Sequence, residues 1–524
     1  MPSYLHPGVY IEEIPSGSKP IEGVSTSTAA FVGNAFRGPA NKPNLIGTWD
    51  DYIAGYSDYN QSSGVSDTTD HMALAVRAFY QNGGKAAYIC RVLEDSTSET
   101  PIAASINLQS GGSDVLTVTA SSEGNWGDEL RVVITHNGST DFNLFIGNAT
   151  TATTPSLFVP LVSESFKGLS MTPTDDNFVE KVVNGASVLV NVSVQNNATN
   201  FPDADTPNGD DEFADPRALT GSEESGPAPN DYQALYDNIL RKYPDVSIIV
   251  LPGVNWDASN TNNIDIINHT INHCESTMSR VVIVDPPANT ELTSIAEVND
   301  LELPTSTYSA LYYPWVNVSN PLYHPDSNPT ASQTLAIPPS AVAAGMWAKI
   351  DGKRGVWKAP AGVETRVSVS GLKFTVEDLE QDSLNPAGVN CLRNRPGYGP
   401  VFWGSRTLAT RADPEWRYVP VRRTAIYIEQ SIYNGIQWAV FEPNDDPLWS
   451  ALRANIGSFM NGMLRAGAFQ GATANDAYFV RCGKGDTMTQ GDIDRGQVII
   501  VVGFAPLKPA EFVILRLQQK VEQQ

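Results

Sequence analysis

The chain of 524 residues has a formal net charge of −24, from 34 Lys and Arg against 58 Asp and Glu, and 41% of its residues are hydrophobic. This length predicts two or three domains, and 41 Gly with 36 Pro favour a β-rich or mixed architecture over a helical bundle. The acidic balance argues against nucleic acid as a partner. No run reaches the roughly 20 apolar residues that span a bilayer, and no basic stretch followed by an apolar one opens the chain. We therefore expect neither direct membrane insertion nor a secretory signal peptide.

Charge is distributed unevenly along the chain. Residues 391–524 hold fifteen Lys or Arg and twelve Asp or Glu, a net charge of +3, so the first 390 residues carry −27. Such a division predicts different electrostatic faces for different partners. The alternative is that acidic loops only keep the protein soluble. The four cysteines, Cys90, Cys274, Cys391 and Cys482, are too scattered for a zinc site or a disulfide framework and are predicted to be isolated thiols.

Both ends of the chain have the pattern of extended strands. Near the N-terminus, Val9 and Ile11 alternate with polar neighbours, and Pro and Gly bound the run on both sides. A terminal strand without a partner in its own domain normally frays unless something captures it. We predict extended arms at residues 1–24 and 509–524, the second of which follows the prolines at 506 and 509.

The first core segment, residues 25–97, contains a strand ending at Gly33, a helix over residues 70–80 and a strand over residues 86–92. Gly83, Gly84 and Lys85 lie between that helix and the strand. A phosphate-binding loop lies between a strand and a helix and needs a longer spacing. The glycines are therefore predicted to end the helix.

Residues 98–195 are predicted to form a β-rich outer domain that is inserted into the core. Residues 196–230 are rich in Asn, Asp, Pro, Gly and Ser, and they are predicted to form an acidic flexible linker. Their carboxylates suggest calcium. However, the two positions where an EF-hand loop needs Asp or Asn and then Gly hold Pro207 and Asn208. Calcium is therefore the less favoured interpretation.

From residue 231 the pattern changes to α/β. Continuous apolar strands at residues 246–251 and 281–285 alternate with helices, which is typical of a parallel sheet covered on both faces. The helices are expected at residues 231–241, 264–279 and 339–349. We assign residues 231–389 to this α/β domain and expect it to complete the core begun by residues 25–97. The predicted fold class is thus α/β and α+β multidomain, with an α/β core built from discontinuous N- and C-terminal segments.

Residues 390–508 are assigned to a C-terminal domain. Strands are predicted at residues 424–428 and 498–504, and a strong amphipathic helix at residues 447–465. Asp446 is expected to cap this helix, with Pro447 in its first position.

No arrangement of residues in the sequence predicts catalysis. There is no nucleophile elbow, no HExxH, no Walker A and no GxGxxG after a strand. His269 and His273 lie one helical turn apart beside Cys274, but without a nearby Glu two imidazoles on a solvated helix are the preferred interpretation. We predict no catalytic residues, no metal and no cofactor.

Several short motifs occur in one order along the chain. They are the N-terminal arm pattern, Gly124-Asn125-Trp126-Gly127-Asp128, Pro338-Pro339-Ser340 with Gly345, Trp403-Gly404-Ser405-Arg406-Thr407, and Tyr418-Val419-Pro420-Val421-Arg422-Arg423. In this order they resemble the contractile tail sheath proteins of myophage tails, R-type pyocins and phage-like contractile injection systems. The resemblance covers most of the chain and leaves residues 196–230 unmatched.

The resemblance implies a structural role. Sheath subunits polymerise as stacked hexameric rings around an inner tube protein and contract to drive that tube through a target envelope. The partners that the resemblance implies are other copies of the chain, the inner tube protein, the baseplate proteins and the tail terminator protein. It also implies assembly in the bacterial cytoplasm, as part of a phage tail or phage-like particle. The alternatives are an α/β hydrolase-like enzyme, for which no triad is found, and a non-contractile tube protein of the same lineage. The kind of particle stays open.

The resemblance also predicts interface residues. The arms are expected to pair with strands of neighbouring subunits through Val9, Tyr10, Ile11, Phe512, Val513, Ile514 and Leu515. The more basic C-terminal domain is expected to face the tube, with its helix at residues 447–465. Leu452, Ile456, Phe459, Met460 and Met463 would face the core of the subunit. The tube-facing candidates on the other arc are Ser450, Arg453, Gly457, Asn461 and Arg465.

Overall fold

The computed structural model describes residues 20–58, 63–94, 102–138, 141–148, 164–205, 216–222, 226–326 and 328–512. The chain divides into two compact units. The core unit contains residues 25–426 and 509–524, and the C-terminal unit contains residues 427–508 and 1–24. The division falls inside one helix, α9 (Val419–Gly435). The predicted mixed, multidomain fold class is confirmed.

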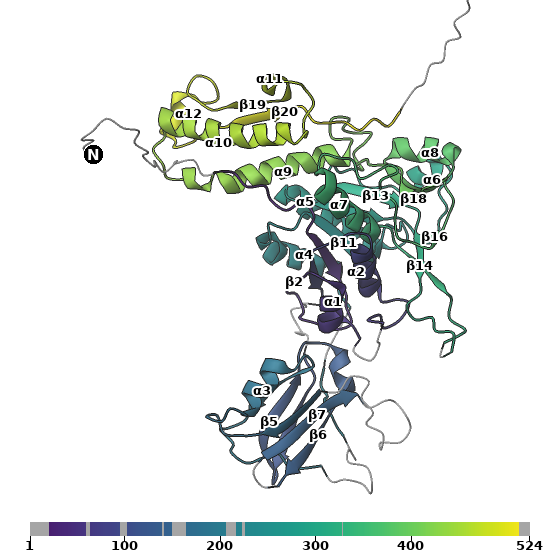
Figure 1. Cartoon of the computed structure of the whole chain (residues 1–524), viewed down its shortest axis with the longest axis vertical. Coiled ribbons are helices and arrows are strands. Elements are labelled where there is room, and N and C mark those ends of the chain that lie inside the picture. Colours follow the sequence, from purple (N-terminus) through teal and green to yellow (C-terminus); the bar gives the residue numbers. More distant parts are fainter. Residues whose placement is uncertain are drawn as a thin grey trace, which may run out of the picture. The chain divides into compact units, whose positions relative to one another are not determined.

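An eight-stranded sheet forms the centre of the core unit (Figure 1). Its order is β18 (Gly399–Phe402), β17 (Val389–Arg395), β13 (Ser309–Tyr313), β12 (Val281–Asp285), β11 (Ile248–Asn255), β1 (Ala29–Gly33), β3 (Ala87–Arg91) and β2 (Asn44–Ile46). All neighbours pair in parallel except the two edge strands, β18 and β2. Every residue of β1, β12 and β13 is buried, so both faces of the sheet are covered and the strands read as continuous apolar runs.

Helices and a small sheet complete the core unit. The helices are α1 (Trp49–Tyr56), α2 (His71–Gln81), α4 (Pro229–Asn238), α5 (Thr261–Thr277), α6 (Ile295–Asp300), α7 (Ser340–Arg354) and α8 (Asp378–Leu384). The small sheet has the order β15 (Thr334–Ile337), β14 (Val316–Ser319) and β16 (Gly371–Leu372). As predicted, α2 ends before the glycines, and Gly83 has φ +108° at this turn.

The segment between β3 and α4 has its own hydrophobic core, which includes Trp126 and Phe142. One sheet holds β4 (Ser105–Ser110), β5 (Ser113–Ala120) and β9 (Val190–Val194). The other has the order β10 (Arg217–Ala218), β6 (Leu130–Asn137), β7 (Asp141–Asn148) and β8 (Glu164–Leu169), and α3 (Val179–Ala186) belongs to the same segment.

The prediction of a solvent-exposed linker over residues 196–230 is wrong for part of that range. Asp205 bonds to the strand β6: its backbone N–H donates to the carbonyl of Ile134, and its carboxylate accepts the Ile134 N–H at 2.7 Å. Strand β10 pairs with β6, and Leu219 is fully buried. The polar composition predicts a flexible linker, but a few residues are enough to attach a polar segment to the edge of an existing sheet. Here backbone pairing and one carboxylate make that attachment.

The C-terminal unit is built on the long helix α10 (Asp446–Arg465). A two-stranded sheet, β19 (Tyr478–Arg481) with β20 (Val501–Phe504), accompanies it, together with the short helices α11 (Ala474–Ala477) and α12 (Gln490–Asp494). The cap of α10 is Asp445, one residue before the predicted cap, and its side chain accepts from the Leu448 N–H at 3.1 Å.

Two further predictions about the end of the core are wrong. Residues 424–428 are helical and belong to α9. From Val419 to Ile426 nearly every side chain is buried, so the helical period is hidden and β-branched residues suggest a strand. The domain boundary predicted at residue 390 also fails, because β17 and β18 are strands of the central sheet.

One sequence motif fixes helix α7 to the sheet. Ser340 begins α7, and the carboxylate of Asp285, the last residue of β12, accepts from its backbone N–H at 2.9 Å and from its hydroxyl at 2.5 Å. Gly345 lets α7 approach α2 closely, since a Cβ there would lie 2.5 Å from the backbone oxygen of Phe79. Burial raises the pKa of Asp285 to about 7, although both bonds from Ser340 act to lower it.

This raised pKa predicts a pH-dependent stability. Between about pH 4 and 7 the folded chain keeps a proton on Asp285 that the unfolded chain has lost, so the free energy of unfolding should fall as pH rises through this range. One such proton contributes a slope of up to about 1.4 kcal/mol per pH unit. Asp285→Asn keeps an oxygen that accepts from the Ser340 N–H, its amide N–H can donate to the Ser340 hydroxyl, and the variant should flatten the slope, as measured by urea denaturation at several pH values. Asp300→Asn, at an exposed carboxylate of the same unit, is the control; an unchanged slope in Asp285→Asn would contradict the assignment.

Anchors of the terminal arms

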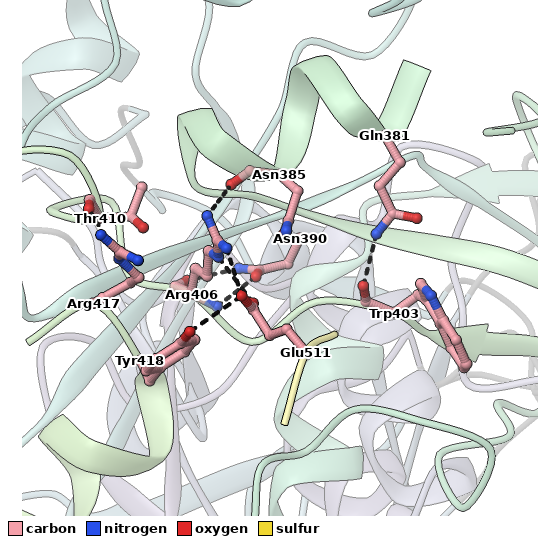
Figure 2. Close-up of polar contacts among 9 residues, drawn as sticks. All are labelled: Gln381, Asn385, Asn390, Trp403, Arg406, Thr410, Arg417, Tyr418 and Glu511. Carbon is pink, nitrogen blue, oxygen red and sulfur yellow. Dashed lines mark hydrogen bonds and ion pairs between the residues drawn. The ribbon is translucent and has the colours of Figure 1, made fainter. Parts of the chain in front are cut away.

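The C-terminal segment is fixed to the core unit by one acidic side chain, Glu511 (Figure 2). Its carboxylate accepts two bonds from the Arg406 guanidinium, from Nε at 2.9 Å and from Nη2 at 2.5 Å, and one from the Tyr418 hydroxyl at 3.1 Å. The Arg406 and Glu511 side chains are only 8% and 15% exposed. A bidentate pair with this degree of burial defines both position and direction of the chain at residue 511.

Arg406 is itself held in place from several directions. Its Nη1 donates to the carbonyl of Asn385 at 3.0 Å, and its backbone N–H donates to the side chain of Asn390 at 2.6 Å. Gly404 allows this approach, because a Cβ there would lie 2.9 Å from the Cα of Asn390. Burial acts to lower the pKa of Arg406, but Glu511 outweighs it, and the pKa lies above its ordinary value. The Trp-Gly-x-Arg-Thr motif thus shapes a receptor for Glu511.

The second arginine motif fixes the start of α9. The Arg422 guanidinium lies over the rings of Trp416, at 3.6 Å, and Tyr308, at 4.6 Å. Arg423 forms a fully buried ion pair with Asp351 of α7 and donates to the carbonyl of Thr26 at 2.7 Å. These contacts connect the start of α9 to α7 and to the segment just before β1, which lie far apart in the sequence.

Within the C-terminal unit, residues 20–24 are packed against the second half of α9. Ile21 is buried, and the backbone N–H of Val24 donates to the Ser431 hydroxyl at 3.1 Å. A Cβ at Gly435 would lie 2.6 Å from the side chain of Ile21. The predicted N-terminal arm at residues 1–24 is therefore docked at its last residues.

Most of the predicted arm residues fall outside the described residues. These are Val9, Tyr10, Ile11, Val513, Ile514 and Leu515. Phe512, the residue directly after the Glu511 anchor, is 77% exposed. The two arms stay a prediction, and the sequence gave no indication of either anchor, because the partners of Val24 and Glu511 lie far away along the chain.

The two-stranded sheet β19–β20 presents apolar side chains at the surface. Phe479 is 50% exposed, and Val501 on the neighbouring strand is also exposed. Gly503, opposite Phe479, leaves room for its ring, since a Cβ there would lie 2.3 Å from that ring. Among the residues that the structure describes, β19 and β20 pair only with each other, so each has one unpaired edge. A strand is predicted at residues 498–504, but the exposed apolar side chains and the unpaired edges are not apparent from the sequence.

Helix α10 separates the predicted tube-facing residues into two groups. Arg453 donates to the carbonyl of Cys482 and to the hydroxyl of Ser450, and the carbonyl of Gly457 accepts from the Tyr478 hydroxyl at 3.2 Å. Arg453 and Gly457 thus face the β19–β20 side of their own unit. Ser450 and Arg465 are exposed, and Asn461 is half-buried. The apolar arc is as expected: Leu452, Ile456, Met460 and Met463 are buried, and Phe459 lies against Tyr427.

The histidine pair on α5 does not form the solvated pair predicted from the sequence. His273 is buried, stacks on Tyr236 at 4.8 Å and lies 3.3 Å from Nη1 of Arg280. Burial, with the nearby Arg280 and Arg241, lowers the pKa of His273 to about 3. Across the described residues, no group of three or more His, Cys, Asp or Glu side chains is placed to hold a metal ion. Of the helices in the same described ranges, none has both the length and the apolar character needed to cross a bilayer.

Comparisons with known proteins agree with this organisation. The family model of the phage tail sheath protein central domain matches residues 226–408, and that of the phage tail sheath C-terminal domain matches residues 411–520. The tail sheath protein of Burkholderia phage BcepMu is 22% identical over 491 residues, which are 90% of this chain and 89% of that protein. A putative prophage major tail sheath protein of Pseudomonas aeruginosa is 28% identical over 180 residues, covering 33% of this chain and 44% of that protein.

Solved sheath structures share the fold along almost the whole chain. The sheath of an extracellular contractile injection system in its contracted state is 25% identical, with a TM-score of 0.57, and the match covers 99% of both chains. The contracted helical sheath of the anti-feeding prophage is 24% identical, with a TM-score of 0.58 over 99% of this chain and 100% of that chain. Together the two family models match more than half of the sequence. The chain belongs to the phage tail sheath protein family, and its role is that of a structural sheath subunit.

Proposed function

We propose that this chain polymerises as stacked six-fold rings around an inner tube protein and contracts to drive that tube through a target envelope. The observation that carries the proposal is the match, along nearly the full length of both chains, to a sheath in its contracted state. The proposed partners are other copies of the chain, the inner tube, the baseplate and the tail terminator. A related sheath chain occurs in a baseplate structure, which supports the baseplate as a partner. Assembly in the bacterial cytoplasm is part of the proposal.

The enzymatic alternative has no support. The matching families are those of structural sheath proteins. The α/β core resembles folds that carry hydrolases, but a fold does not specify a reaction. A non-contractile tube protein of the same lineage remains the second candidate, and the contracted state of related sheaths favours contraction.

The arms would keep neighbouring subunits joined during contraction. An extended strand that adds to a neighbour's sheet is held by main-chain hydrogen bonds, and the bodies attached to it can rotate without breaking them. The anchors at Val24 and Glu511 support this arrangement because each fixes the root of an arm to a folded unit. The sheet β19–β20 is the receptor that we propose for the arms. A sheet of two strands is marginal alone, and its free edges and exposed apolar residues would be completed by added strands.

The same proposal places the units in the assembly. The β-rich segment that follows β3, and the acidic stretch after it, would face solvent, because a self-contained insertion is easiest to accommodate there. The C-terminal unit, with helix α10, would face the tube. Since Arg453 and Gly457 contact their own unit, the exposed residues Ser450 and Arg465, with the half-buried Asn461, are the tube-facing candidates that remain.

Purified chains should assemble, and removal of the C-terminal arm should prevent it. The full chain is expected to form rings or tubes in negative-stain electron microscopy, whereas an enzyme would form a discrete small oligomer. A chain that ends at Lys508 should be folded by circular dichroism yet stay unassembled, because it lacks both the arm and Glu511. Long tubes from the truncated chain would rule out the role of this arm.

Glu511→Gln tests the anchor without removing the arm. The neutral side chain keeps its size but loses the charge that pairs with a buried Arg406, and a buried hydrogen bond to a charged group is typically worth about 1.5–3 kcal/mol. Pelleting assays should therefore recover clearly less polymer. Glu364→Gln, in an exposed ion pair with Arg354, is the matched control and should behave as wild type. Equal polymer yields for all three chains would show that the anchor is dispensable.

Arg465→Glu tests the contact with the tube. Partly solvated ion pairs of about 0.2–1 kcal/mol each can hold an extended sheath on its tube and still break during contraction. The variant should lower the yield of extended particles co-expressed with the tube and leave tube-free contracted sheath unchanged. Arg495→Glu, at a similarly exposed arginine of the same unit, is the control. If extended particles form at normal yield, α10 does not contact the tube through this residue.

A further inference from the structure

A polar cavity of about 540 Å³ opens in the core unit between helices and the small sheet. Arg77 and Gln81 contribute to its lining from α2, Lys349 from α7, and Ser319 from β14. The segment of residues 366–370 contributes Arg366 and two serines. Its volume lies in the range of sites that bind small molecules or several side-chain groups.

The walls of this cavity are fixed by contacts of the backbone. The N–H of Ser368 donates to the side chain of Asn82 at 2.8 Å, and the N–H of Ser370 donates to the carbonyl of Asn317 at 2.7 Å. Gly83, with φ +108°, lets the stem of Lys349 pass: a Cβ at this glycine would lie 2.8 Å from the Cβ of the lysine. The cavity is therefore formed before any ligand arrives.

Three cations, Arg77, Lys349 and Arg366, line the cavity. Within the part of the chain that the structure describes, no ion pair includes Arg77, Lys349 or Arg366. The Nη1 atom of Arg77 is buried without a hydrogen-bond partner. Burial alone lowers the pKa of Arg77, and no carboxylate acts to raise it again.

Two fully buried arginines of the same unit, Arg91 and Arg280, have backbone carbonyls as acceptors. Arg91 donates to the carbonyls of Ala35, Gly38 and Glu123, and Arg280 donates to those of Leu240 and Tyr243. A buried charged group without acceptors is costly, so a guanidinium nitrogen left without one indicates a place for an acceptor from outside the unit.

We propose that this cavity receives acidic side chains of a second copy of the chain. The inference rests on the proposed function, in which copies lie against one another throughout the sheath. Two observations favour this occupant. The chain carries 58 Asp and Glu and a net charge of −24, so a positive cavity is complementary to the surface that its own copies present. The cavity is also much larger than one small inorganic anion requires.

The contact can be tested by cross-linking full-length sheath. Chains labelled with ¹⁵N and unlabelled chains are assembled together and treated with a carbodiimide, which joins an amine to a carboxylate in direct contact. Mass spectrometry should find Lys349 joined to an Asp or Glu of the other isotope. Absence of any inter-copy product from Lys349, in polymers where other lysines do cross-link, would overturn the proposal.

A variant with Lys349→Glu and Arg366→Glu supplies the second test. Its critical concentration for assembly should rise by about tenfold, equivalent to about 1.4 kcal/mol per contact. Lys42→Glu with Lys242→Glu makes the same charge change at exposed sites of the same unit and should assemble like wild type. Arg77→Gln, which removes a half-buried charge and adds none, should weaken assembly without loss of folding.

Two further outcomes would overturn the inference. One is assembly of the Lys349→Glu, Arg366→Glu variant at the wild-type concentration. The other is saturable binding of inorganic phosphate to wild-type chains that is lost in this variant while its assembly is unchanged, since the cavity would then hold a soluble anion. If the wild-type chain itself fails to polymerise, the proposed function fails, which is distinguishable from failure of this contact alone.

Discussion

The ion pair between Arg406 and Glu511 determines where the chain leaves the folded core at its C-terminal end. Under the proposed function, a subunit that keeps its neighbours while it moves relative to them needs a firm attachment at the root of each connecting strand. A carboxylate bound by two guanidinium nitrogens and a tyrosine hydroxyl meets that need, because the pair is directional and shielded from water. Gly404 and Asn390 contribute indirectly by placing the guanidinium.

Arginine side chains fix distant segments of the chain to one another at several points of the core unit. Arg423, paired with Asp351, connects α9 to α7 and to the segment before β1, and Arg422 lies over two aromatic rings. A guanidinium has five donors in a rigid plane, so one side chain can hold several distant segments in a fixed relation. A buried ion pair adds little net stability to the fold, but loss of one partner is strongly destabilising. Such pairs therefore favour the one arrangement of the segments in which both partners are present.

The two units differ in what they present. In the core unit a central sheet with fully buried strands is built for rigidity. The C-terminal unit has a smaller hydrophobic cluster around Leu448, Trp449 and Leu452, and a sheet of two strands with apolar residues at its surface. Surfaces and edges of this kind are unfavourable in an isolated chain and are covered when subunits assemble. In the proposed assembly, the core unit stays intact and the exposed edges of the C-terminal unit are completed by neighbouring copies.

From the sequence alone, the mixed fold class, the helix α2 with its glycine stop and the buried strands β11 and β12 could be predicted, because local periodicity and capping carry these signals. The family was indicated by the resemblance of several ordered motifs. The helical nature of residues 424–428 could not, because burial on all sides removes the period that identifies a helix. The attachment of Asp205 to β6, the receptor for Glu511 and the division of the α10 residues also required the tertiary structure. Each depends on partners tens to hundreds of residues away or on the opposite side of a helix. Local sequence determines which elements form, and only the packing of distant segments decides which of the charged side chains are paired within the chain.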